Sequence, residues 1–428
     1  MSDASLALIV ILFLLLFSST PIAVALGLTT FAYFFYFTTI PLTQIPETLF
    51  NALNTFPLMA IPFFVLAATI MSRGGISERL TTAGIAVVGN FRGGLAMTAV
   101  MSCVFFAAIS GSSPATVVAV GTLLIPAMIR SGYGPDFSVG LIATSGSLGI
   151  LIPPSIPLIV YGIATEVSIG DLFIAGILPG LMAGAMLMVM VAIISRKRNY
   201  GTGEHAVTMS RQEKFKAFRD AGLSLLLPAL VLGGIYGGVF TPTEAAAMAV
   251  FYALLISLLV YREITIKDLG AILLASARTS AMVMFIIANG ILFSFVLTSE
   301  RIPDEITEAM VALDLNKWTF LALVTVILLI AGCFMETSSA ILIIAPILLP
   351  IAVELGVDPV HLGIIIVMNL EIGMITPPLG LNLFVASGLS GMSVLRVAKA
   401  SLPSAGVLLV ALLIVTYFPK ISLLLVGG

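Results

Sequence analysis

Charged residues are scarce in this sequence. Asp, Glu, Lys and Arg make up 9% of its 428 residues, whereas 60% are hydrophobic and the mean hydropathy is +1.19. Soluble globular proteins carry roughly 25% charged residues, so a chain with this few cannot cover a water-exposed surface. A helix needs about 20 apolar residues to cross a membrane, and residues 173–194, 223–239 and 402–418 are examples of such stretches. The sequence therefore predicts an all-α integral membrane protein.

Histidine and cysteine are also in short supply. The two histidines, His205 and His361, and the two cysteines, Cys103 and Cys333, fit no zinc-binding spacing, and we expect both cysteines to be buried free thiols. Neither histidine and no lysine is expected deep in the membrane, which argues against an intramembrane enzyme. The absence of a G-x-x-x-x-G-K-[ST] run argues against ATP-driven transport. The net charge of −2 suggests no nucleic acid partner, and nothing indicates an organic cofactor.

The positions of Lys and Arg predict the orientation, because short cytoplasmic loops are enriched in them. When the densest basic segment, residues 196–219, is placed inside, 15 of the 19 basic residues fall on the cytoplasmic side. Acidic residues such as Asp304, Glu305 and Asp314 fall outside. Both termini are then external. The apolar residues 1–17 lack the basic flank of a signal peptide, so we expect them to remain as a membrane helix.

The sequence repeats itself at a spacing of 224 residues. The matched positions are mostly prolines and glycines, which set backbone conformation; they are Pro126 with Pro350, Gly132 with Gly356, Pro135 with Pro359, Gly149 with Gly373, and Pro153-Pro154 with Pro377-Pro378. The basic residues give the two halves opposite orientations, as in many secondary transporters. We expect a first inverted repeat at residues 1–200, a basic cytoplasmic linker at 201–220 and a second inverted repeat at 221–428.

Each half contains two apolar arms joined by an irregular polar segment. Residues 110–114 (SGSSP) join the arms of residues 93–131, which Arg92 and Arg130 flank at one membrane face. Residues 333–339 (CFMETSS) join the arms of residues 317–353. Each pair is predicted to form a re-entrant hairpin whose tip lies at membrane depth, where irregular backbone survives only if protein or water satisfies it. The hairpins enter from opposite faces, so their tips should meet.

A helix broken by a double proline follows each hairpin, at about residues 136–165 and 360–390. Glycine and proline free backbone carbonyls at these breaks, and serine and threonine hydroxyls lie nearby in the sequence. Such hard oxygen ligands suit sodium, so two sodium sites are predicted. The expected fold has two inverted repeats, about ten spanning helices, two re-entrant hairpins and two broken helices.

Glu336 and Glu371 are the only carboxylates expected deep in the membrane, where ionisable groups are costly and usually functional. Ser112 and Ser147 occupy the corresponding positions of the first repeat. Each glutamate could act in function, or could hydrogen-bond backbone donors freed by the break and hold its shape. The sequence leaves both interpretations open.

Three runs resemble the large membrane subunit of TRAP (tripartite ATP-independent periplasmic) transporters: GSSPATVVAVGTLLIPAM, SGSLGILIPPSIPLIVYG and EIGMITPPLGLNLFVASG. The resemblance covers nearly the whole chain. It implies the transport subunit of a sodium-driven importer of organic acid anions, such as C4-dicarboxylates or sialic acid. It also implies an elevator-type transporter, in which the hairpins travel with substrate against a fixed scaffold.

The resemblance further implies a bacterial inner-membrane location with periplasmic termini, surrounding lipid, and two protein partners. One partner is a small four-helix membrane subunit and the other is a periplasmic substrate-binding protein. Nothing in the chain resembles the small subunit, so we expect it to be a separate chain. A stand-alone sodium–dicarboxylate symporter is the main alternative. A channel fits poorly, because two dead-end hairpins would block a path.

In this family the sodium ions sit at the hairpin tips beside the broken helices. The first site carried over to this sequence comprises Ser110, Gly111, Ser112, Ser113, Ser147 and Gly149. The second comprises Gly332, Met335, Glu336, Thr337, Gly373 and Thr376. Substrate groups are expected between the tips, where helix N-termini and hydroxyls can bind a carboxylate, at Ser113, Pro114, Pro154, Ser338, Pro378 and Asn382.

Overall fold

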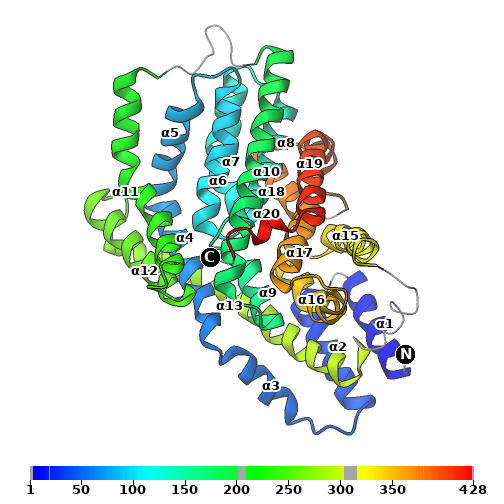
Figure 1. The fold of residues 1–428 in the computed structure, drawn as a ribbon. Helices are drawn as coiled ribbons and strands as arrows, with labels where there is room; N and C mark the ends of the chain where they lie inside the picture. Colours follow the sequence, from blue (N-terminus) through cyan, green and yellow to red (C-terminus); the bar gives the residue numbers. More distant parts are fainter. Residues whose placement is uncertain (1–2, 19, 201–208, 303–315, 379, 427–428) are drawn as a thin grey trace.

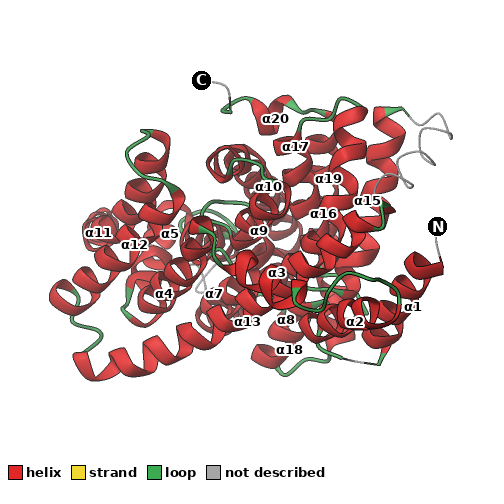
Figure 2. Ribbon diagram, turned by 90° about the horizontal axis from the view of Figure 1, so that it is seen from below, coloured by secondary structure: helices red, strands yellow, loops and turns green. Residues whose placement is uncertain are grey.

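The protein is helical throughout the part that the computed structural model describes, residues 3–18, 20–200, 209–302, 316–378 and 380–426, and no strand occurs there (Figures 1 and 2). Nine helices within these ranges are long and apolar enough to cross a membrane, and three of them are hairpin arms. Shorter apolar helices supplement them. The predicted all-α, multi-pass membrane fold is confirmed. Asp304, Glu305 and Asp314, predicted to be external, lie outside the described residues.

The first half of the chain forms helices separated by short turns. They are α1 (Asp3–Phe17), α2 (Ile22–Tyr36), α3 (Gln44–Leu53), α4 (Ala60–Arg73), α5 (Ile76–Val88), α6 (Gly94–Ser110), α7 (Ser113–Arg130), α8 (Pro135–Ser145), α9 (Ile156–Thr165) and α10 (Ile169–Arg198). A 3₁₀ turn, Phe56–Met59, leads into α4, and another, Gly146–Ile150, extends α8.

The second half is built in the same way. Its helices are α11 (Arg211–Tyr236), α12 (Pro242–Leu255), α13 (Ile266–Ser299), α15 (Lys317–Phe334), α16 (Thr337–Glu354), α17 (Pro359–Gly373), α18 (Leu381–Ser390), α19 (Val394–Tyr417) and α20 (Lys420–Leu423). The segment expected to be a linker, residues 201–220, lies partly outside the described residues. Its second half differs from the expectation, because Ser210 and Glu213 form a capping box that starts α11 at Arg211.

The helix boundaries follow the 224-residue spacing of the sequence. Adding 224 to the bounds of α7, 113 and 130, gives 337 and 354, which are the bounds of α16. Adding 224 to the first residue of α8, Pro135, gives Pro359, the first residue of α17. The repeated prolines and glycines therefore begin and interrupt equivalent helices in the two halves.

The hairpins and broken helices of the two halves interlock. The hairpin of the first half is α6 and α7, and that of the second half is α15 and α16. The second part of each broken helix contacts the hairpin of the other half, since α9 packs on α16 and α18 packs on α7. The first parts pack on helices of the opposite half as well, α8 on α19 and α17 on α10. These elements consequently form one body whose parts cannot separate without losing core contacts.

A second group of helices lies beside this body. The 34-residue α13 contacts α2, α3 and α4 and reaches the hairpin arm α16. Helix α12 packs along α4, and α11 packs along α5 (Figure 1). Since α4 and α13 face the hairpin tips, they form a wall against which the tips lie.

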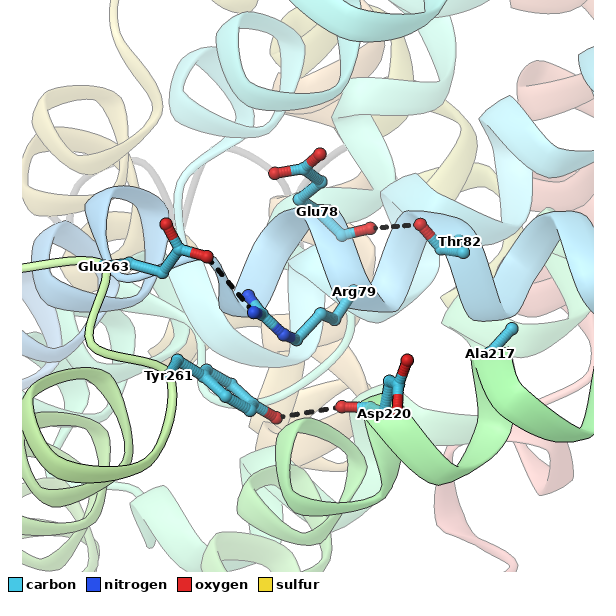
Figure 3. A pocket seen from close by; sticks show the side chains of 7 residues that line it. All are labelled: Glu78, Arg79, Thr82, Ala217, Asp220, Tyr261 and Glu263. Carbon is cyan, nitrogen blue, oxygen red and sulfur yellow. Dashed lines mark hydrogen bonds and ion pairs between the residues drawn. The ribbon is translucent and has the colours of Figure 1, made fainter.

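A polar pocket of about 400 Å³ joins α5 and α11 to the turn between α12 and α13 (Figure 3). The Arg79 guanidinium lies 3.8 Å from the centroid of the Tyr261 ring and 3.1 Å from Glu263 Oε1. It also donates to the Gly75 carbonyl at 2.8 Å, just before α5 begins. The Tyr261 hydroxyl in turn donates to the Asp220 carbonyl on α11. Arg79 therefore ties α5 to the turn between α12 and α13, and Tyr261 extends this link to α11.

Replacing Arg79 by Ala should destabilise the protein by about 1–2 kcal/mol, because a cation–π contact and a half-buried ion pair are lost together. The measurement is the melting temperature of the purified protein in detergent. Arg92→Ala is the matched control, since Arg92 is an exposed arginine in the turn before α6. Equal melting temperatures for the two variants would contradict this role of Arg79.

Candidate functional site

The hairpin tips meet at a cavity of about 510 Å³. The first tip contributes residues 110–115 and the second contributes Glu336, Thr337 and Ser338. Glu371 and Met374 line it from the second broken helix, and Ile156 from the first. The opposite side consists of α4 residues, including Thr69 and Arg73, and α13 residues, including Thr279 and Met282. The cavity therefore separates the interlocked hairpins from the wall formed by α4 and α13.

The first tip is an irregular turn held by hydroxyl groups. Helix α6 ends at Ser110, and Gly111 follows with a φ of 57°, which glycine adopts without steric cost. The Ser112 carbonyl accepts hydrogen bonds from the backbone N–H and the hydroxyl of Thr116, at 3.1 and 2.9 Å. Ser112 occupies the N-cap position of α7, but its side chain makes no capping hydrogen bond. The hydroxyl of Ser112 therefore remains available to a ligand of the cavity.

The first broken helix lies directly against this tip. A Cβ atom at Gly149 would lie 3.1 Å from the Ser112 carbonyl oxygen, and one at Gly111 would lie 2.7 Å from the Pro154 carbonyl oxygen. The Gly111 carbonyl accepts from the Ile156 N–H at 3.3 Å, where α9 begins. The peptide bond between Pro153 and Pro154 is cis. Glycines thus allow the tip and the break to touch through their backbones.

The second tip and its broken helix are in even closer contact. A Cβ atom at Gly332 would lie 2.7 Å from the Leu370 carbonyl oxygen, and one at Gly373 would overlap the Gly332 Cα atom. The Thr337 hydroxyl hydrogen-bonds Glu371 Oε1 at 3.2 Å across this junction. Thr376 instead donates to the Ile372 carbonyl of its own helix at 2.8 Å. The peptide bond between Pro377 and Pro378 is cis, as in the first half.

Glu336 and Glu371 differ in how their oxygens are used. Glu336 is the N-cap of α16: one oxygen accepts from the Ser339 N–H at 3.1 Å and the other from the Ser338 hydroxyl at 3.0 Å. The sequence left open whether each glutamate acts in function or holds the shape of the break. These hydrogen bonds favour the structural role for Glu336. Glu371 is 2% exposed, and its Oε2 atom has no hydrogen-bond partner among the described residues.

We expect Glu336→Ala to destabilise the hairpin by about 1 kcal/mol, because removing an N-cap side chain leaves a backbone N–H of α16 without its partner. Thermal unfolding of the purified protein measures the loss. Glu354→Ala is the control, since Glu354 is an exposed glutamate at the far end of the same helix. A destabilisation by the control as large as that of Glu336→Ala would argue against the cap.

Only some of the expected site residues line the cavity. Ser110, Gly111, Ser112, Ser113, Pro114, Glu336, Thr337 and Ser338 line the cavity. The expected residues Ser147, Gly149, Gly332, Met335, Gly373 and Thr376 do not line it. Neither do Pro154, which is buried, nor Pro378, which is exposed. These two prolines are therefore placed at the breaks and away from the cavity surface.

Asn382 has a different position from the one its assignment to the substrate implied. It is fully buried on α18, and its Nδ2 atom donates to the hydroxyl oxygens of Ser113 and, at 3.2 Å, Ser147. It thus joins the tip and the broken helix of the other half. The wall residues Thr69, Arg73 and Thr279 could not be predicted, because an apolar spanning helix gives no local signal of which face lines a cavity.

The donor set at the tips fits a sodium ion. It consists of hydroxyls, backbone carbonyls and carboxylate oxygens, which are the hard ligands that alkali and alkaline-earth ions prefer. Next to the tips, two buried acceptor atoms, Glu371 Oε2 on α17 and Asn382 Oδ1 on α18, have no hydrogen-bond partner among the described residues. Buried acceptors of this kind cost free energy unless a cation or a donor satisfies them.

Comparison with known proteins identifies the family. The model described as "Tripartite ATP-independent periplasmic transporter, DctM component" matches residues 9–421. The C4-dicarboxylate TRAP transporter large permease protein DctM of Vibrio cholerae is 47% identical over 423 residues, which cover 94% of this chain and 93% of that protein. The isethionate TRAP transporter permease protein DctMQ of Oleidesulfovibrio alaskensis is 44% identical over 97% of this chain and 65% of its own longer chain.

A solved structure shares the fold at low sequence identity. The YdaH transporter of Alcanivorax borkumensis has a TM-score of 0.63 with this protein and is 16% identical, and the alignment covers both chains completely. That similarity concerns architecture alone. The family match over nearly the whole length and the high identity to the large permeases together show that this chain belongs to the DctM-component family, the large permease subunits of TRAP transporters.

Proposed function

We propose that this protein carries small organic acid anions, C4-dicarboxylates in the first instance, into the cell together with sodium ions. The observation that carries the proposal is the cavity of about 510 Å³ between two oxygen-rich hairpin tips. This volume is in the usual range for small-molecule sites, about 300–1,000 Å³. The names of the two relatives above refer to a C4-dicarboxylate and to isethionate, and both are small anions. Sialic acid remains a further candidate from the resemblance of the sequence.

Electrostatics supports the sodium coupling. The cavity is lined by two carboxylate side chains, Glu336 and Glu371, and by one cationic side chain, Arg73. A dicarboxylate entering this space would be repelled by carboxylate charge on these two side chains, and like charges at short range in a low-dielectric site are costly. Bound sodium would supply the compensating positive charge. The residues proposed to hold it are the two sets of tip and break residues given in the sequence analysis.

The packing supports an elevator mechanism. The hairpins and broken helices interlock through the contacts of α9 with α16 and of α18 with α7. The cavity lies between this body and the wall of α4 and α13. A rigid body that moves along such a wall would carry tips, ions and substrate together. We propose that the interlocked hairpins are the moving part and that α4 and α13 belong to the fixed scaffold.

The family implies two partners. We propose that a small four-helix membrane subunit binds this chain in the lipid bilayer and that a periplasmic binding protein delivers the substrate. The longer isethionate relative has about a third of its length beyond the region matched here, enough for a fused small subunit. We further propose an inner-membrane protein with both termini in the periplasm, from the asymmetric distribution of Lys and Arg.

Uptake by proteoliposomes tests the proposal. The chain is reconstituted with its small membrane partner and offered labelled C4-dicarboxylates, isethionate and sialic acid, each with and without its binding protein and an inward sodium gradient. Uptake that requires both sodium and the binding protein is the expected result. Sodium-driven uptake without any binding protein would favour the stand-alone sodium–dicarboxylate symporter. Uptake that is the same with and without a sodium gradient would overturn the proposed sodium coupling.

A further inference from the structure

Arg73 is the one cationic side chain among the described residues that line the cavity between the hairpin tips and the wall. It is the last residue of α4 and is exposed. No hydrogen bond or ion pair joins its guanidinium to another residue in the described part of the chain. A guanidinium presents several donors in a planar fork that matches a carboxylate. Arg73 is therefore free to bind an anion in the cavity.

Asp268, at the start of α13, is a carboxylate with which Arg73 interacts electrostatically. No ion pair joins the two side chains. The Asp268 Oδ2 atom instead accepts hydrogen bonds from the backbone N–H and the hydroxyl of Thr265, at 2.8 and 2.7 Å. Asp268 is thus engaged at the beginning of its own helix, and Arg73 keeps its capacity for a bidentate contact with a ligand.

The wall offers the cavity no other charged group. The α4 residues Val65, Thr69 and Arg73 line the cavity at four-residue intervals, so they lie on one face of the helix over about 12 Å. The Thr69 hydroxyl donates to the Val65 carbonyl at 2.8 Å, and the Thr279 hydroxyl on α13 donates to the Ala275 carbonyl at 3.3 Å. These two hydroxyls are used within their own helices, whereas the guanidinium of Arg73 is not.

Arg73 also marks one end of the cavity. The end of α4 packs against the turn between α12 and α13, where a Cβ atom at Gly74 would overlap the Ser257 side chain and one at Gly75 would lie 2.8 Å from the Glu263 Cγ atom. This turn carries Arg262, a basic residue of the kind that marks the cytoplasmic side. Arg73 therefore lies at the end of the cavity where a substrate would leave toward the cytoplasm.

The hairpin tips offer a second place for a carboxylate, across the cavity from the wall. Helices α7 and α16 begin there, at Ser113 and Thr337, and a helix N-terminus carries free N–H groups and a partial positive charge. The hydroxyl of Ser112 is available as well. A ligand with two carboxylates can contact a tip with one and Arg73 with the other, whereas a monocarboxylate can make only one of these contacts.

We propose that Arg73 binds the second carboxylate of a dicarboxylate substrate and thereby makes the cavity prefer dianions to monoanions. The inference rests on the proposed transport of organic acid anions with sodium. Bound sodium offsets Glu336 and Glu371 and admits the first carboxylate at the tips, and Arg73 recognises the second from the wall. Because α4 belongs to the proposed scaffold, this contact exists only while the tips lie beside the end of α4, and it is broken when the interlocked body moves.

The test is equilibrium binding of labelled succinate, with unlabelled butyrate as a competitor. The two acids have the same number of carbon atoms, but butyrate has a single carboxylate. Binding is measured at saturating sodium on the purified chain with its small membrane partner, for the wild type, Arg73→Gln and Arg73→Lys. Arg278→Gln is the matched control, because Arg278 is an exposed arginine on the other wall helix, α13, and does not line the cavity. Melting temperatures in detergent report on folding.

We expect the wild type to bind succinate at least about tenfold more tightly than butyrate, because the charge-assisted contact with Arg73 is made by succinate alone. In Arg73→Gln the affinity for succinate should fall at least about tenfold, while that for butyrate should change by less than about twofold. Arg73→Lys should restore part of the preference, since an ammonium keeps the charge without the planar fork. It also serves if Arg73→Gln fails to fold. The control should match the wild type.

The outcomes separate this inference from the proposed function. If the wild type binds neither anion, the proposed function and the role of Arg73 are both overturned. If it binds succinate and Arg73→Gln binds succinate equally well, the role of Arg73 is overturned while the proposed function stands. An equal loss of succinate and butyrate affinity in Arg73→Gln would show that Arg73 does not recognise the second carboxylate. An equal effect of Arg278→Gln would show a general effect of positive charge, and it would also overturn the contact.

Discussion

Sodium-dependent uptake should fall by at least about tenfold when Gly373 is replaced by Ala, because inserting a methyl group into a closed contact costs about 1–3 kcal/mol or displaces the backbone. The added Cβ atom would overlap the Gly332 Cα atom and lie 2.9 Å from the Cys333 N atom, and backbone atoms cannot rotate away. The tip and the break must then separate. Since both contribute to the proposed second sodium site, the oxygens of that site would move apart. Uptake by proteoliposomes and the melting temperature in detergent are the two measurements.

Gly406→Ala provides the control for this variant. Gly406 lies within α19, and a Cβ atom added there would meet no atom within 4 Å. Replacing a glycine by alanine in the interior of a helix is favourable by about 1 kcal/mol, so the control should be at least as stable as the wild type. Normal uptake by Gly373→Ala would show that the close contact between Gly332 and Gly373 is not needed for transport.

Removal of the Thr337 hydroxyl should raise the sodium concentration for half-maximal uptake by about tenfold, because an oxygen of the proposed second sodium site and its hydrogen bond to a carboxylate are lost together. Thr337 is 1% exposed and lies 3.2 Å from Glu371 Oε1, at the second tip. The corresponding first-half variant, Ser112→Ala, should have the same kind of effect, since the Ser112 side chain makes no capping bond of its own. The measurement is uptake as a function of external sodium at fixed substrate concentration.

Two further variants distinguish loss of a ligand from loss of packing. Thr337→Ser keeps the hydroxyl and should restore most of the sodium affinity. Thr325→Ala removes a buried threonine from α15. The Thr325 hydroxyl donates a hydrogen bond to the Leu321 carbonyl of the same helix at 2.8 Å, so it is not free to bind an ion. That variant should leave the sodium dependence unchanged. Equal sodium dependence in the wild type, Thr337→Ala and Ser112→Ala would remove both residues from the proposed sites.

Elements that depend on local sequence could be predicted well. Hairpin arms and breaks were predicted because long apolar runs, prolines and glycines act within a few residues of their own position. The arms predicted at 93–131 and 317–353 correspond to α6 with α7 and α15 with α16. The segment predicted as a linker is helical in its second half, because the capping box of Ser210 and Glu213 starts α11 there. Its signal was present in the sequence, as a serine followed three residues later by a glutamate.

The candidate site was only partly accessible from the sequence. Tip residues such as Ser112 and Thr337 could be singled out because they interrupt apolar runs. The roles of the two glutamates could not be distinguished, since either one could cap a helix or face a cavity. Asn382 was assigned to the substrate, but its partners Ser113 and Ser147 are 269 and 235 residues away along the chain. No local pattern contains such a contact.

The sequence by itself determined that this is a helical membrane protein with two related halves, because hydrophobicity, charge and backbone-setting residues act locally. Only the tertiary structure decided which polar groups meet. The contacts of α9 with α16 and of α18 with α7 bring the two tips to one cavity, which Glu371 lines, and place Asn382 behind it against Ser113 and Ser147. The physical reason is that the pairing of buried polar groups is set by how helices pack across the whole chain, and the free energy of each group depends on that pairing.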